Sequence, residues 1–184
     1  MARPVTLVPL ACFKCDTPIP AQPEEVAWVC ARCGQGLALN DDPEASGKGT
    51  LPLVVQFATG IPPAGRGKPY WVADGTVQLQ RQIYGHGDKG KEAQSLWAQP
   101  RRFFIPAFDC SLETMLSLGQ RMLLQSPALQ PGPAAAFEPV TLHRRDIQPM
   151  ADFIVLAIEA GRSDMLKEVR LNVRLSEAAL WVLP

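Results

Sequence analysis

Hydrophobic and polar positions alternate with a period of two in two stretches of the chain. Val77, Leu79 and Ile83 alternate with glutamines, and the apolar residues from Val169 to Leu175 alternate with arginine and asparagine. Because successive side chains of a strand point to opposite faces of a sheet, each stretch predicts a strand with one buried and one solvated face.

Turn and edge signals predict further strands. Asp74-Gly75 is a dipeptide that adopts positive φ readily, so it predicts a tight turn within a hairpin over 70–84. The run 101–108 contains Pro106, which has no N–H to donate, so this strand is expected to lie at a sheet edge or to end there. Two other strands are predicted at 51–57 and 179–183.

One helix and one ambiguous segment complete the pattern. Residues 111–125 carry apolar side chains at helical spacing, Asp109 or Ser111 can cap the N-terminus, and Pro127 lies just past the end. The run 153–160 is apolar on both faces and fits either a central strand or a buried helix. Its length and β-branched residues favour the strand.

Four of the five cysteines form two Cys-x-x-Cys pairs, Cys12 with Cys15 and Cys30 with Cys33, separated by 14 residues. A two-residue gap lets a tight turn aim both thiolates at one ion, and zinc prefers four such ligands in a tetrahedron at about 2.3 Å. Two reactive dithiols are a weaker interpretation, because no βαβ pattern surrounds either pair. An iron centre with the same four-thiolate geometry stays open.

These residues resemble the zinc ribbon family, in which two cysteine knuckles sit at the tips of β-hairpins. The second knuckle continues into Gly34 and Gly36, whereas Asp16 follows the first, where ribbons often have glycine. The resemblance covers about residues 10–40 and implies a structural Zn²⁺ held by all four paired cysteines. Four cysteine ligands leave no coordination position for water or substrate, so catalysis at the ion is not expected.

Composition then divides the chain into three parts. The predicted zinc ribbon occupies 1–40, the polar stretch 41–50 indicates a linker, and 51–184 contains the strands and the helix. Within the last part, 85–92 is predicted to be a polar loop, and 126–136, rich in Pro and Ala, a spacer. The expected fold class is α+β: an N-terminal zinc ribbon followed by a mostly antiparallel β domain with one main helix.

Charge and hydropathy narrow the function classes. The chain has 18 Lys and Arg against 18 Asp and Glu, and this balance removes the simplest argument for a protein that coats nucleic acid or a membrane surface. No apolar run approaches the ~20 residues that cross a bilayer, and the interrupted N-terminal apolar patch is too short for a signal peptide. Because an odd number of cysteines argues against a secreted disulfide framework, we expect a cytoplasmic protein.

No residue pattern in the chain indicates catalysis. His86 and His143 accompany no recognisable nucleophile and are expected to be lone surface histidines, and Cys110 is expected to be a buried structural thiol. The loop 85–91 matches G-x-x-x-x-G-K, but Glu92 stands where a phosphate-binding loop needs Ser or Thr. We therefore expect a protein that is not an enzyme.

Two binding functions remain. In the first, zinc fixes a small module, and the protein is an adaptor or accessory subunit that contacts a protein partner. Residues 1–50 carry four basic against six acidic side chains, which favours this hypothesis because a nucleic-acid-binding ribbon should be basic. In the second, the protein binds nucleic acid through the ribbon and the segment 51–110, which carries seven basic against four acidic side chains. Five aromatic residues fit a core better than a base-stacking platform: Trp71, Phe103, Phe104, Phe108 and Trp181.

Overall fold

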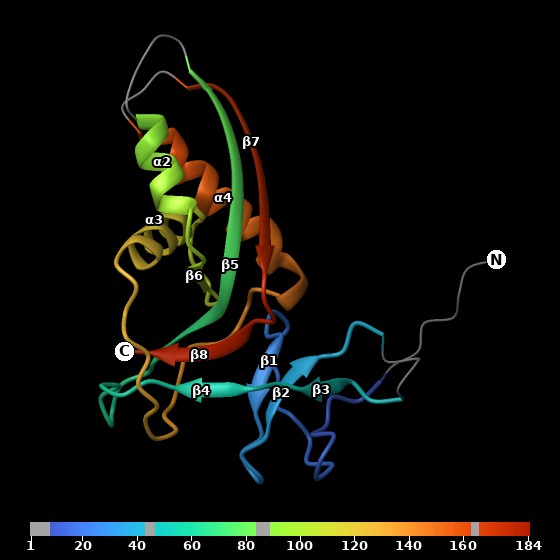
Figure 1. Ribbon diagram of the computed structural model, residues 1–184. Coiled ribbons are helices and arrows are strands. Elements are labelled where there is room, and N and C mark those ends of the chain that lie inside the picture. Colours follow the sequence, from blue (N-terminus) through green and yellow to red (C-terminus); the bar gives the residue numbers. More distant parts are fainter. Residues whose placement is uncertain (1–7, 43–46, 84–88, 163–165) are drawn as a thin grey trace, which may run out of the picture.

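The computed structural model describes residues 8–42, 47–83, 89–162 and 166–184, and it has the α+β architecture that the sequence predicts. A small antiparallel sheet lies in the N-terminal part, and a five-stranded mixed sheet with three α-helices follows it (Figure 1). The strands are β1 (Ala27–Val29), β2 (Gly36–Leu39), β3 (Thr50–Pro52), β4 (Val55–Phe57), β5 (Lys68–Ile83), β6 (Arg101–Pro106), β7 (Leu166–Leu175) and β8 (Ala179–Leu183). The helices are α2 (Lys89–Trp97), α3 (Leu112–Leu124) and α4 (Ile147–Ala160), with a 3₁₀ turn η1 (Arg144–Asp146) before α4.

The N-terminal sheet has the strand order β1-β2-β3, and both pairs are antiparallel. β1 pairs with β2 from Ala27 opposite Ala38 to Val29 opposite Gly36. β3 lies at the far end of the polar stretch that follows β2, and it joins β2 with Leu51 opposite Ala38. The described residues from 8 to 52, which contain this sheet, are called the N-terminal module below.

The segment predicted as one strand, 51–57, is two short strands in two different sheets. β3 belongs to the N-terminal sheet, whereas β4 pairs in parallel with β8 in the five-stranded sheet. Between them, the Leu53 amide donates to the Gly36 carbonyl, and the Leu180 amide donates to the Val54 carbonyl. The chain therefore crosses from one sheet to the other at Leu53 and Val54, and these hydrogen bonds tie the crossing to both sheets.

β5 is one continuous strand of 16 residues, so the predicted hairpin over 70–84 is wrong. The Asp74-Gly75 dipeptide stays extended because the chain is paired on both sides there, with β6 along one edge and β7 along the other. The glycine at position 75 is not needed for a turn; it lets the side chains of Leu175 and Phe103 pack close to the backbone. A Cβ atom there would lie 2.8 Å from both side chains.

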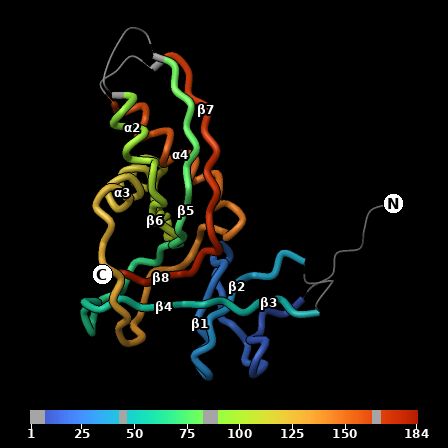
Figure 2. The backbone as a smooth tube through the Cα atoms, viewed as in Figure 1, coloured from blue at the N-terminus to red at the C-terminus, as the bar shows by residue number. Residues whose placement is uncertain are grey.

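β5 organises the whole five-stranded sheet. β8 pairs with its first part, Lys68–Val72, and β7 pairs with the rest, Gly75–Ile83, so that β8 follows β7 along one edge. Figure 2 shows β5 and β7 running side by side as a long arm. The terminal strand predicted at 179–183 is confirmed as β8, and the alternating strand predicted from Val169 to Leu175 is confirmed within β7.

The run 153–160, predicted to be a central strand, is instead the C-terminal part of helix α4. Phe153, which begins the apolar run, is 46% exposed. The buried residues of the helix start earlier and recur at helical spacing: Ile147, Ala151, Ile154, Val155, Ile158 and Glu159. A window limited to the apolar run hides this period, which explains the wrong choice between strand and helix.

Of the other two helices, α2 was not predicted from the sequence and α3 was. α2 begins inside the predicted polar loop 85–92 and buries Ala93 and Trp97, four residues apart. α3 confirms the helix predicted over 111–125, and the Thr114 amide donates to the Ser111 hydroxyl at its N-terminus at 3.2 Å. The apolar residues of α2, Ala93, Leu96 and Trp97, all lie in its C-terminal half and span little more than one turn, which is too short for a helical period to show in the sequence.

The main core lies between the helices and the long strands. α2 packs against β5, α3 against β6, and α4 against β6 and β7 (Figure 1). Ala27 and Leu53 of the N-terminal side belong to the same buried cluster as Ile154 of α4, so the two sheets share one core. The five aromatic residues considered above are all buried, at most 9% exposed: Trp71, Phe103, Phe104, Phe108 and Trp181.

Candidate metal centre

Two short loops of the N-terminal module have the same backbone hydrogen bonds, and each carries a pair of cysteines. In each loop the carbonyl of the first cysteine accepts an amide four residues on, from Asp16 in one loop and Gly34 in the other, at 2.8 Å in both. Both residues have positive φ, 56° and 70°. Asp is among the few non-glycine residues that adopt this conformation readily, so the first loop makes the same turn without the usual glycine.

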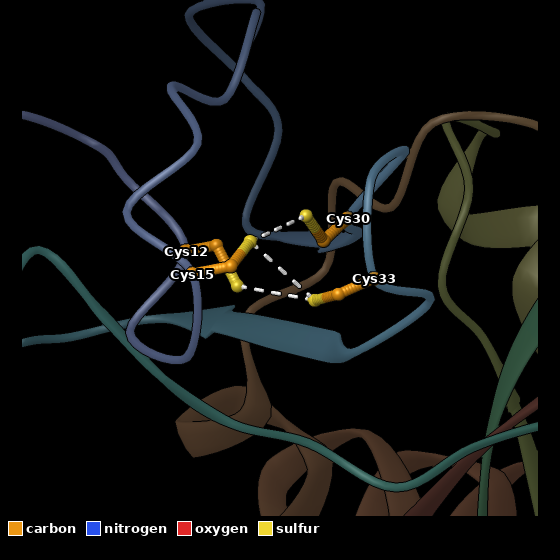
Figure 3. A group of neighbouring side chains, drawn as sticks. All are labelled: Cys12, Cys15, Cys30 and Cys33. Atoms are coloured by element: carbon orange, nitrogen blue, oxygen red, sulfur yellow. Dashed lines mark hydrogen bonds between the residues drawn. The ribbon is translucent and has the colours of Figure 1, made fainter.

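The two loops bring four sulfur atoms together (Figure 3). The Sγ atom of Cys15 lies 3.6 Å from that of Cys30 and 3.6 Å from that of Cys33, and the Sγ atoms of Cys12 and Cys33 are 3.7 Å apart. All four Sγ atoms lie within 4.8 Å of one another. Because a disulfide bond is only about 2.05 Å long, the group consists of four free thiols.

The spacing of the sulfur atoms fits a tetrahedral metal ion. Four ligands about 2.3 Å from a central ion are about 3.8 Å from one another in an ideal tetrahedron. The three sulfur–sulfur distances given above, 3.6 to 3.7 Å, are close to this value. The donor set is therefore suited to a four-coordinate ion that prefers thiolates, a class that includes Zn²⁺ and iron.

Ionisation of these thiols also favours a cation between them. Hydrogen bonds from Thr17 lower the pKa of the Cys15 thiol to about 6. The Gln35 amide lowers the pKa of the Cys33 thiol, but burial and the three neighbouring cysteines outweigh it and raise that pKa to about 11. Each thiolate opposes the formation of the next, and a bound cation removes that conflict because it attracts all four.

The cysteines make up much of the core of the N-terminal module. The buried members of its hydrophobic cluster are Cys12, Trp28, Cys30 and Leu37. The Thr50 hydroxyl donates to the Ala11 carbonyl at 2.6 Å and ties β3 to the first cysteine loop. A core this small offers little apolar burial apart from the cysteines, so metal binding and folding of the module are expected to be coupled.

The five-stranded sheet and the helices α2, α3 and α4, called the main domain below, contain a buried ion cluster that the sequence analysis missed. Glu159 on α4 is 0% exposed, and its Oε1 atom accepts the Trp97 indole N–H at 2.8 Å and the Arg162 Nε–H at 3.0 Å. The Nε atom of Arg81, on β5, lies 2.7 Å from Glu159 Oε2. The carboxylate therefore joins α2, β5 and the end of α4. The signal available in the sequence was a single acidic residue in the apolar run 153–160.

The two histidines and the fifth cysteine, which the sequence analysis considered for catalysis, do not join the group of four thiols. The side chain of His143 is 13% exposed rather than on the open surface; its Nε2 lies 3.0 Å from Asp41 Oδ1, and its Nδ1 accepts the Arg145 amide at 3.1 Å. Cys110 is half-buried, and burial raises the pKa of its thiol, which keeps it protonated near neutral pH. His86 lies outside the described residues.

Comparison of the chain with protein-family models, with curated proteins and with solved structures finds no match. Among the helices in the described part of the chain, none is long and apolar enough to cross a bilayer. The best-defined site among the described residues is the group of four cysteines beside a small antiparallel sheet.

Proposed function

We propose that the four cysteines bind one structural Zn²⁺, that the N-terminal module is a zinc ribbon, and that the protein is a non-enzymatic adaptor or accessory subunit. The observation that carries this proposal is the group of four sulfur atoms within 4.8 Å of one another. Four thiolates fill the coordination of Zn²⁺, so the ion holds the fold instead of reacting with a substrate. Because thiolates persist in a reducing compartment, we place the protein in the cytoplasm.

The residues around the module support a role in contacts with another protein. The Val26 amide donates to the Val140 carbonyl at 2.8 Å, so β1 is joined directly to the main domain. Leu51 and Val54, at the crossing between the two sheets, are 42% and 62% exposed. These two exposed apolar side chains provide apolar surface that a partner protein can cover. In this proposal the ion holds the N-terminal module together, and with it β3, the strand that carries Leu51.

The test measures metal and partners on the same material. The full chain is purified from the cells that make it, zinc and iron are quantified by mass spectrometry, and half of the eluate is treated with nuclease. We expect about one zinc per chain, as four cysteine ligands require, and a partner protein that survives the nuclease. A Cys33→Ser variant serves as the metal-free control. Iron in place of zinc contradicts the metal assignment, and complete loss of the co-purifying material on nuclease treatment contradicts the adaptor.

Nucleic-acid binding is a second candidate function, favoured by the outer face of β5 and β7. The side chains that alternate with those of the core form four cross-strand polar pairs: Thr76 with Arg174, Gln78 with Asn172, Gln80 with Arg170, and Gln82 with Glu168. Amide and guanidinium groups read base edges, and a two-stranded β-ribbon fits the major groove of DNA. Base stacking on the aromatic residues is not part of this candidate, because these residues are buried.

This candidate is tested by fluorescence anisotropy with a labelled DNA duplex and a labelled single-stranded RNA at increasing NaCl concentration. Phosphate contacts release counterions, so true binding must weaken as the salt rises. Replacement of Arg170 and Arg174 by Ala should reduce binding, whereas Arg121→Ala, on α3, should not. Undetectable or salt-independent binding would eliminate the candidate.

A further inference from the structure

The outer side of β7 is a long strand edge. β7 pairs with β5 along one side, and among the described strands none pairs with its other side (Figure 1). The strand has ten residues and contains neither Pro nor Gly. Soluble proteins usually shorten, interrupt or cover such an edge, because an open row of backbone groups pairs with another strand. The edge of β7 is therefore suited to strand pairing.

The other outer strands of the five-stranded sheet are covered. β6 ends at Pro106, which has no N–H, and α3 packs against this strand. On β4, the Gly132 amide donates to the Phe57 carbonyl at 2.7 Å, so the segment after α3 covers that edge. The described part of the β7 edge has one side-chain cap, the Gln148 amide, which donates to the Val173 carbonyl at 3.0 Å.

Hydrogen bonds to β5 show which residues of β7 direct their backbone groups to the open edge. The Ser176 amide donates to the Asp74 carbonyl at 2.7 Å, and the pairing keeps this register back to residue 168. Because backbone groups alternate between the two sides of a strand, even-numbered residues bond to β5 and odd-numbered residues point outward. The cap that Gln148 places on Val173 agrees with this assignment.

The sequence of β7 is complementary to itself about Leu171. When a second copy pairs antiparallel with Leu171 opposite Leu171, the outward groups of odd-numbered residues meet, and 169–173 alone form about six backbone hydrogen bonds. No like charges are opposed in this register, and each apolar residue faces an apolar one. The opposed pairs are Glu168 with Arg174, Val169 with Val173, Arg170 with Asn172, and Leu171 with itself.

Other registers that satisfy the backbone groups fit less well. A centre at residue 170 opposes Arg170 to itself, and a centre at Asn172 opposes Arg170 to Arg174 twice. Like charges directly opposite each other destabilise a strand pair. A centre at Val169 opposes Glu168 to Arg170, but it uses a shorter part of the strand. The charges therefore select the register centred on Leu171.

The charged groups that meet in this register are accessible. Glu168 Oε1 lies 2.8 Å from Arg170 Nε, and the two side chains are 42% and 74% exposed. A carboxylate accepts through both oxygens, so Glu168 can bind a second guanidinium. Arg174 is exposed and has no ion pair within the part of the chain that the structure describes. Each Glu168 would lie between Arg170 of its own copy and Arg174 of the other.

We propose that the protein forms a two-fold symmetric dimer by antiparallel pairing of β7 with β7 of a second copy, with Leu171 at the axis. The two five-stranded sheets then form one continuous sheet, and α4 covers the face on which Val173 packs against Ile154. The pair is closed, because each copy uses the same edge. This inference goes beyond the adaptor function and does not depend on the metal, since β7 belongs to the main domain.

Sedimentation velocity on the full-length, zinc-loaded protein tests the dimer. The average mass should rise from that of one chain towards that of two between about 5 and about 500 µM. Val169→Pro removes an N–H that points to the open edge and leaves the hydrogen bonds to β5 in place, as Pro is tolerated on such an edge. This variant should stay monomeric over the whole concentration range.

Two charge variants test the register and its symmetry. Arg174→Glu opposes two glutamates, and Glu168→Arg opposes two arginines, so each should weaken self-association at least about tenfold. Mixed in equal amounts, the two variants should associate about as tightly as the wild type, because every opposed pair then joins opposite charges. Arg121→Glu and Glu113→Arg, the same changes on exposed residues of α3, should alter self-association less than about twofold. Zinc content and far-UV circular dichroism confirm that each variant is folded.

The remaining outcomes overturn the proposal. A wild type that stays monomeric up to about 500 µM excludes the dimer, and a dimer that Val169→Pro leaves intact uses another surface. Charge variants that fail to associate with each other exclude the self-complementary register. A monomeric wild type whose purified partner protein is lost in Val169→Pro assigns the edge to a strand of that partner. The adaptor function is tested separately by zinc content and by the partner, and neither requires the dimer.

Discussion

Removal of the buried charge on Glu159 should destabilise the main domain strongly. The Glu159→Gln variant keeps the size of the side chain and an oxygen that accepts the Trp97 and Arg162 hydrogen bonds. It removes the negative charge that faces Arg81 and Arg162, whose side chains are only 7% and 13% exposed. The variant therefore tests whether the carboxylate is required as a counter-charge or only as a hydrogen-bond acceptor.

The structure sets the expected size of the effect. Breaking a buried ion pair by removing one partner costs about 3–5 kcal/mol, because the other charge stays buried without compensation. Arg162 keeps a second carboxylate, since Glu92 Oε2 lies 3.8 Å from its Nη1 and the Glu92 side chain is 56% exposed. We therefore expect the lower end, about 3 kcal/mol, which corresponds to a fall in Tm of about 6–12 °C for a chain of this length.

Urea denaturation of the zinc-loaded protein, followed by tryptophan fluorescence, measures this difference. Glu177→Gln is the matched control: its side chain is 84% exposed and pairs with Arg144 at 2.8 Å, so its loss should cost less than about 0.5 kcal/mol. A Glu159→Leu, Arg81→Met double variant should be more stable than Glu159→Leu alone, because no charge of that pair is left buried. A Glu159→Gln protein within about 0.5 kcal/mol of the wild type would refute the reasoning, since a surface pair has that effect.

Three further predictions follow from the cysteines and from one glycine. Cys33→Ser should lose zinc and the amide NMR dispersion of the N-terminal module, whereas Cys110→Ser should keep both; a zinc-loaded Cys33→Ser protein would contradict the site. Gly75→Ala should cost about 1–3 kcal/mol in urea denaturation, because its Cβ would lie 2.8 Å from Leu175 and Phe103, whereas Gly90→Ala, with open space around it, should not destabilise. Burial raises the pKa of the Cys110 thiol, so iodoacetamide at pH 8 should alkylate this thiol more slowly in the folded than in the unfolded chain; equal rates would contradict the shift. Any stability that the protonated thiol contributes is present below the ordinary thiol pKa and is lost as the pH rises above it.

Local patterns in the sequence determined those features that depend on neighbouring residues only. The two Cys-x-x-Cys spacings predict the thiol group because a two-residue gap makes a tight turn by itself, and the structure brings the four sulfurs within 4.8 Å. The alternation from Val169 to Leu175 and the helical spacing in 111–125 each span several periods, and both elements are present. In the strand and in the helix, the buried and half-buried residues recur at the spacing that the local pattern predicts, so composition and position agree.

Long-range pairing decided the features that local patterns predicted wrongly. Asp74-Gly75 favours a turn, but strands on both edges hold it extended, and their ladder hydrogen bonds outweigh the local preference. The segment 51–57 is divided between two sheets because its halves meet different partners. Glu159 lies in the core because arginines from β5 and from the end of α4 reach it. Distances between segments far apart in the chain control these features, and only the tertiary structure sets those distances.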